Sequence, residues 1–154
     1  MTSQSTIIAE QRFDMETIGV PKHLAPNKET RVLQYVIQCT AEETLLSPVT
    51  ETGNTSKKRF SLEKIVLAVK KLLLEGNQPS SARAILRGNQ EMANNDYGFV
   101  AAALRWLELL KAYGDEAYPN LSTATPGQDP EEKLKEIRKI LVRGETLQSG
   151  QIRQ

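Results

Sequence analysis

The segment EGNQPSSARAILRGNQEM, residues 75–92, places a short apolar stretch between two clusters of turn-forming residues. Pro79 and Ser80 favour the start of a helix and Gly88 favours its end, so we expect a helix over about residues 81–87. A short helix between two turns is typical of a corner in a helical bundle. It is also typical of a helix-turn-helix that reads DNA.

The two faces of this short helix differ in character. Ala82, Ile85 and Leu86 can face inward, whereas Arg83 and Arg87 are four residues apart and share an outer stripe. An amphipathic helix of this kind packs its apolar face on its neighbours and leaves the charged face at the surface. The character of the helices on either side therefore distinguishes a corner of a helical bundle from a DNA-reading helix-turn-helix.

The preceding helix begins after Ser61, a favourable N-cap residue, and ends at Gly76. Most of its apolar side chains share one broad face at 100° per residue, and Leu67 and Leu74 form a second stripe on the far side. A helix that is apolar on two sides is usually contacted from both, so we expect it to be central. The broad face comprises Leu62, Ile65, Val66, Val69, Leu72 and Leu73.

The following helix is expected to begin at Asn94 or Asn95 and to reach about Tyr113, with Gly114 beyond it. Its apolar arc is so wide that few polar residues interrupt it, and we expect it to be the second central helix. The interrupting residues are Arg105, Glu108 and Lys111.

Two outer helices complete the expected fold. Asn27 can cap a helix over about residues 28–46, which Ser47 and Pro48 would end, and its apolar residues recur at three-to-four spacing. Asp129 can cap another over residues 130–143, with Pro130 at the first helical position. The recurring residues of the earlier helix are Val32, Leu33, Val36, Ile37 and Thr40.

These patterns predict an all-α fold, a compact bundle of about five helices without strands of any length. Residues 1–26 read as an extended N-terminal arm, residues 27–143 as the α-helical domain, and residues 144–154 as a polar C-terminal tail. The whole chain of 154 residues is long enough for one such core. Terminal segments are ordered only where something ties them down, so we expect the arms to mediate self-association.

Charge is unevenly distributed along the chain, although the net charge is only +1. Residues 57–88 carry eight lysines and arginines against two acidic residues, and both flanks are acidic. A basic block between acidic flanks is typical of a surface that binds nucleic-acid phosphates, and also of a solvated face without a partner. The candidate binding residues are Lys57, Lys58, Arg59, Lys64, Lys71, Arg83 and Arg87.

Residues 76–110 resemble the pattern of winged-helix sequences, in which a small second helix precedes a longer reading helix. The resemblance would imply a DNA-binding regulator. However, a helix that reads base edges needs polar side chains facing the groove, and the expected helix over residues 94–113 is apolar around most of its circumference. Only the turn GNQEMANN and Arg105 could supply such groups. The basic residues would therefore contact phosphates rather than read sequence.

No motif indicates a catalytic or metal site. The segment GNTSKKR, residues 53–59, lacks the second glycine of a phosphate loop, and no strand is expected before it. His23 and Cys39 are the only residues of their kinds, so a cysteine–histidine nucleophile pair is a minor alternative and a cysteine-based zinc site is excluded. Tyr97, Phe99 and Trp106 could stack on bases, but their spacing is more typical of a core.

The sequence thus favours a non-enzymatic assembly or scaffold protein that self-associates through its arms and contacts nucleic-acid phosphates through its basic middle. A coat or nucleocapsid-like role is one form of this function. The alternative is a helix-turn-helix or winged-helix DNA-binding regulator. We expect a homo-oligomer without cofactor, metal, membrane contact or small-molecule substrate. In the absence of a visible secretory signal we expect a cytoplasmic or virion location.

Overall fold

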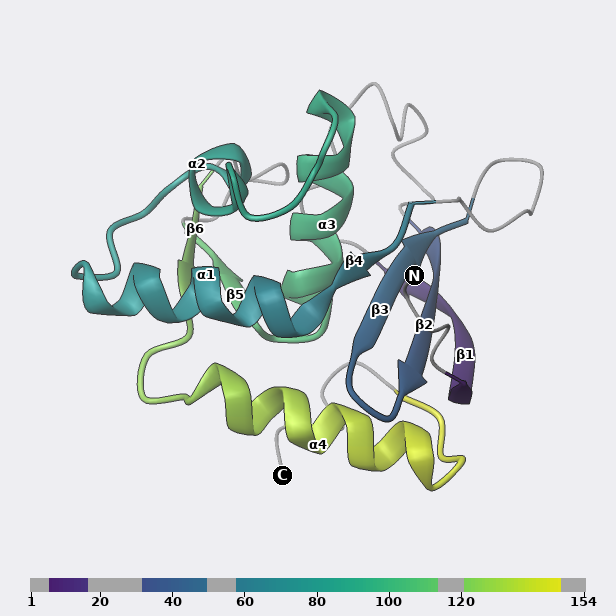
Figure 1. Ribbon diagram of the computed structural model, residues 1–154. Helices are drawn as coiled ribbons and strands as arrows, with labels where there is room; N and C mark the ends of the chain where they lie inside the picture. Colours follow the sequence, from purple (N-terminus) through teal and green to yellow (C-terminus); the bar gives the residue numbers. More distant parts are fainter. Residues whose placement is uncertain (1–5, 17–31, 50–57, 114–120, 148–154) are drawn as a thin grey trace, which may run out of the picture.

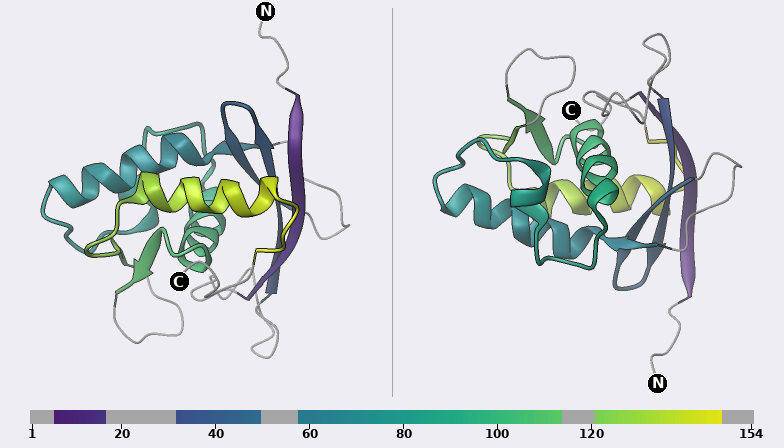
Figure 2. Two further views of the ribbon diagram at one scale, coloured as in Figure 1. Left: turned by 90° about the horizontal axis from the view of Figure 1, so that it is seen from below. Right: turned by 90° about the horizontal axis from the view of Figure 1, so that it is seen from above.

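A four-stranded antiparallel sheet forms one side of the molecule, and the helices pack on one of its faces (Figures 1 and 2). The computed structural model describes residues 6–16, 32–49, 58–113 and 121–147. The fold is mixed α/β, so the prediction of an all-α bundle was wrong. The sheet has the strand order β1-β2-β3-β4, formed by Ile7–Glu16, Val32–Thr40, Thr44–Pro48 and Phe60–Ser61.

The helix expected over residues 28–46 is replaced by strands β2 and β3. Tyr35 and Ile37 point toward the helices and are fully buried, and Ile37 lies opposite Leu46 of β3. This stretch is rich in β-branched and aromatic residues, which favour a strand. The inward residues Tyr35, Ile37 and Cys39 alternate with Val36, Gln38 and Thr40, so the period of two is present and Val36 interrupts it.

Part of the predicted N-terminal arm is strand β1. It pairs with β2 along almost its whole length, with Phe13 opposite Tyr35, and the Phe13 side chain is buried. Part of the predicted C-terminal tail also packs, because the Leu147 side chain is buried and its amide donates to the Gln11 side chain at 3.1 Å. Residues 1–5, 17–31 and 148–154 lie outside the described part of the chain.

Three of the expected helices are confirmed. Ser61 and Asp129 are the caps that the sequence indicated, whereas the short helix is capped by Ser81, one residue after its expected start at Pro79 and Ser80. Ser61 Oγ accepts from the Lys64 amide and Ser81 Oγ from the Ala84 amide. Asp129 Oδ1 accepts from the Glu131 amide. Each cap satisfies an amide that has no partner within its helix. The helices are α1 (Leu62–Leu74), α2 (Ala82–Leu86) and α4 (Pro130–Val142).

Helix α3 (Asn94–Trp106) is shorter than expected, because the chain reverses after Leu107. Glu108 adopts a left-handed backbone conformation with φ 64°, and the Leu109 amide donates back to the Leu104 carbonyl at 2.8 Å. Strand β5 (Leu110–Ala112) follows and pairs antiparallel with β6 (Ser122–Ala124). An antiparallel bridge joins Ser80, which precedes α2, to Ser122 of β6.

Helix α3 is the buried centre of the molecule. Every residue of the run 100–104 is at most 1 % exposed, and five consecutive residues pass all the way round a helix. The sheet is joined to α3 by the Tyr35 hydroxyl, which donates to the Phe99 carbonyl at 2.7 Å, and by the rings of Phe13 and Trp106, whose centroids are 6.0 Å apart. Helix α2 and strand β5 also contact α3.

Helix α1 is buried on one side only, so the prediction that both its faces are covered was wrong. Its broad apolar face packs on the core, whereas Leu67 is 60 % and Leu74 is 86 % exposed. Helix α4 runs beside α1 and α2 lies on its other flank (Figure 1). The outer stripe of α1 is consequently open between two neighbouring helices.

Candidate nucleic-acid interface

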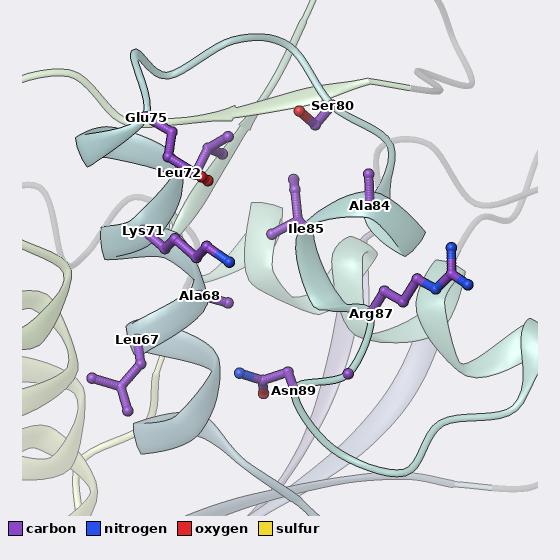
Figure 3. Close-up of a pocket in the computed structure, with 11 residues that line it drawn as sticks. Leu67, Ala68, Lys71, Leu72, Glu75, Ser80, Ala84, Ile85, Arg87 and Asn89 are labelled. Atoms are coloured by element: carbon purple, nitrogen blue, oxygen red, sulfur yellow. The ribbon is translucent and has the colours of Figure 1, made fainter.

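A groove of about 350 Å³ lies between α1 and α2 (Figure 3). One wall is the C-terminal half of α1, and the other comprises α2 and the turn that follows it. Polar atoms contribute much of its surface. The residues that define its character are Leu67, Lys71, Glu75, Ser80, Arg87 and Asn89.

The turn after α2 is fixed to the start of α1 by two amide side chains. Asn89 Nδ2 donates to the Lys64 carbonyl at 2.9 Å. Gln90 Oε1 accepts from the Ser61 amide at 2.8 Å, and Gln90 Nε2 donates to the Ser61 carbonyl at 3.0 Å. Gly88 makes the turn with φ 76°, a conformation that glycine adopts at little cost. The segment GNQ therefore sets the position of α2 against α1, and with it the width of the groove.

Two cations of the predicted basic block line this groove together. Lys71 extends from α1 toward α2, and Arg87 lies on the opposite wall with its guanidinium directed outward (Figure 3). Arg87 follows the last residue of α2 and has extended backbone, with φ −58° and ψ 129°. The sequence predicted that Arg83 and Arg87 share one helical stripe. Arg87 instead lies beyond the end of the helix and does not continue the stripe of Arg83. Glu75, on the wall of α1, is the one acidic residue among those that line the groove.

The other predicted cations are divided between the surface and an ion pair. Lys58 Nζ lies 2.8 Å from Asp96 Oδ2, and Asp96 also accepts from the Ala93 amide at the start of α3. Lys58 therefore has a structural partner. Lys57 lies outside the described residues. The remaining three, Arg59, Lys64 and Arg83, are exposed. Like Lys71 and Arg87 of the groove, they form no ion pair with another described residue.

The outer stripe of α1 alternates lysine and leucine. Lys64, Leu67, Lys71 and Leu74 follow one another at three-to-four spacing, and all four are exposed. Leu67 lines the α1–α2 groove and also a second groove of about 380 Å³ between α1 and α4. The stripe is therefore a ridge with a groove on either side.

The residues that sequence reasoning missed are the acid and the amide of the groove. Glu75 looked like the end of a helix, and Asn89 looked like part of a generic turn. The available signal was positional, because Glu75 lies four residues after Lys71 and Asn89 lies two residues after Arg87. The charge count alone could not place Glu75 in the groove that Lys71 and Arg87 line.

The groups that a base-reading helix would need are already engaged. Arg105 Nη1 donates to Ser122 Oγ at 3.2 Å, and burial lowers the pKa of Arg105, which the nearby Tyr35 hydroxyl partly opposes. Trp106 packs against Phe13, and Tyr97 is partly buried against the core. Arg105, Trp106 and Tyr97 are half-buried, and the two aromatic side chains pack against the core, as their spacing indicated.

Helices α1, α2 and α3 are followed by the paired strands β5 and β6, and an antiparallel bridge joins Ser80, before α2, to Ser122 of β6. In this chain the third helix lies beneath the four-stranded sheet. A reading helix must present polar side chains to base edges, and the run 100–104 of α3 has no exposed face. The central turns of α3, the helix that the DNA-binding alternative expects to read bases, are therefore covered.

Cys39 is a core residue in this structure. Its side chain is fully buried among the inner residues of the sheet, and burial raises the pKa of the thiol. His23, its suggested partner, lies outside the described residues. Within the described ranges no three histidine, cysteine or acidic side chains gather as metal ligands would. No helix of those ranges is long and apolar enough to cross a membrane.

Comparisons with protein-family models, with curated proteins and with solved structures gave no match.

Proposed function

We propose that this chain is a non-enzymatic binding protein that contacts nucleic-acid phosphates through the surface formed by α1 and α2, independently of base sequence. The observation that carries the proposal is that Lys71 and Arg87 line one polar groove without a described ion-pair partner. Lysine and arginine supply the point charge and the planar fork by which proteins hold phosphate oxygens.

The neighbouring cations extend this surface. Lys64 lies one heptad before Lys71 on the outer stripe of α1, and Arg83 lies on α2 four residues before Arg87. Cations spaced along two adjacent helices can contact successive phosphates of one strand, and such contacts carry no base specificity. The burial of the central turns of α3 favours this function over the winged-helix regulator.

The test is a pair of double variants matched for charge. Lys71→Ala with Arg87→Ala removes the two groove cations. Lys111→Ala with Lys139→Ala removes two exposed lysines from β5 and α4, which lie outside the groove. Binding to two unrelated duplexes of equal length is measured by fluorescence anisotropy at fixed salt concentration.

We expect the groove variant to bind both duplexes more weakly by a similar factor, and the control variant to remain close to the unmodified chain. Equal weakening by both double variants would show that net charge alone is responsible and would overturn the groove as the site. Loss of preference for one duplex, with non-specific affinity retained, would instead support the DNA-reading regulator.

A further inference from the structure

Strand β1 is the outermost strand of the four-stranded sheet. It pairs with β2 on one side, and on its other side no described strand accompanies it (Figure 2). An open edge presents a row of backbone donors and acceptors that can pair with another strand. The sequence of β1, IIAEQRFDME, has neither of the residues that most often block such pairing, lysine and proline. Ile7 and Ile8 are 45 % and 52 % exposed.

The charged residues of β1 alternate in sign on one face. Glu10, Arg12 and Asp14 lie at successive outward positions, and all three are exposed. The acids are tied to the neighbouring strand, since Glu10 accepts from Gln38 and Asp14 accepts from Gln34 at 2.7 Å.

Arg12 has no such partner on the sheet. It lies opposite Val36 of β2 and forms no ion pair with a described residue. Its charge is therefore available to a strand that pairs on the open side.

We propose that β1 pairs antiparallel with β1 of a second copy of this chain, with Gln11 opposite Gln11. In this register Glu10 of each copy faces Arg12 of the other, so two opposite-charge pairs form across one two-fold axis. On the inner face Ala9 lies opposite Phe13, a small residue beside a large one. The two four-stranded sheets would become one continuous sheet.

The symmetric registers with the axis at Arg12 or at Phe13 are less favourable. Residues opposite each other must lie on the same face, so the two-fold axis has to pass through a residue of the strand. An axis at Arg12 places the two arginines together and Glu10 opposite Asp14. An axis at Phe13 pairs Arg12 with Asp14 but places Glu10 opposite Glu16. A parallel arrangement in register would put like charges side by side throughout.

The experiment is light scattering on the full chain over a range of concentrations, with circular dichroism to verify folding. Deletion of the arm is unsuitable, because it would also remove the buried Phe13. Instead we compare the single reversals Glu10→Arg and Arg12→Glu with the double variant that carries both. Asp14→Asn is the control, because Asp14 faces an arginine only when the axis passes through Phe13.

We expect the unmodified chain to dimerise, each single reversal to shift the mass toward the monomer, and the double variant to restore the dimer because the two pairs re-form with exchanged signs. Asp14→Asn should dimerise normally. A monomeric unmodified chain, or single reversals that dimerise normally, would overturn the pairing. A folded double variant that stays monomeric, or dissociation of Asp14→Asn like the single reversals, would overturn the register. The substitutions leave Lys71 and Arg87 in place, so nucleic-acid binding is assessed separately.

Discussion

The Tyr35 hydroxyl is expected to hold the sheet on α3, and its removal gives a sharp test of that contact. Tyr35 is fully buried, and its hydroxyl donates to the Phe99 carbonyl at 2.7 Å. Tyr35→Phe keeps the ring and deletes one buried hydrogen bond. Such a bond contributes about 1 kcal/mol to stability. We therefore expect the free energy of unfolding at neutral pH, measured by urea denaturation, to fall by about 1 kcal/mol.

The same substitution should change the alkaline limb of the stability profile. Burial raises the pKa of Tyr35 above its ordinary value. The phenol then stays neutral in the folded chain at a pH where it ionises in the unfolded chain, at about 10. Its contribution to stability is therefore complete below about pH 10 and is lost as the pH rises beyond it. At about pH 11 the unmodified chain should have lost about 1.4 kcal/mol through this group, whereas Tyr35→Phe loses none.

The unmodified chain should therefore be more stable than Tyr35→Phe by about 1 kcal/mol at neutral pH and less stable by about 0.4 kcal/mol near pH 11. All other titrating groups are shared by both chains, so their effects cancel in the difference. Denaturation at the two pH values gives the comparison directly. A difference that stays constant across this range would mean that Tyr35 ionises as easily in the folded as in the unfolded chain, and would refute the buried contact.

Three further changes have defined outcomes. Leu104→Ala, in the fully buried centre of α3, should lower the free energy of unfolding in urea by about 2–5 kcal/mol. Leu74→Ala, on the exposed stripe of α1, should lower it by under about 0.5 kcal/mol. Equal losses would contradict the one-sided burial of α1. Asp129→Ala removes the N-cap of α4 and should cost about 1 kcal/mol, measured in the same way; an unchanged free energy would mean that the cap is not formed. Glu75→Gln removes the acid of the groove and should tighten binding to DNA in anisotropy, so unchanged or weaker binding would place Glu75 away from the bound phosphates.

The helix ends show what the sequence could predict. Helices α1 and α4 end in the same motif, in which Gly76 and Gly144 take positive φ and the next amide donates back into the last turn. Helix α3 ends in this motif as well, but with Glu108 at the left-handed position. A glutamate gives no signal for that conformation, so the sequence extended the helix to Tyr113 and missed β5.

The sequence analysis missed the strands of the sheet for a different reason. The run 35–40 alternates Tyr35, Ile37 and Cys39 with Val36, Gln38 and Thr40, and Val36 interrupts its period of two. Its apolar residues therefore fitted a three-to-four spacing as well as an alternating one. The β-branched residues and Tyr35 favoured a strand, but this preference depends on neighbours that the sequence does not identify. The cations of the groove were predicted from charge, because Lys71 and Arg87 are surface residues whose exposure depends little on the fold class.

The salt dependence of binding tests the central claim most directly. The logarithm of the binding constant for duplex DNA falls against the logarithm of salt concentration with a slope of about −0.9 for each neutralised phosphate. Removing Lys71 and Arg87 together should reduce the magnitude of that slope by about 1.8, the equivalent of two phosphate contacts. The control variant that lacks Lys111 and Lys139 should leave the slope unchanged. A slope that is the same in the groove variant and the unmodified chain would show that neither cation contacts a phosphate, and would contradict the proposed function.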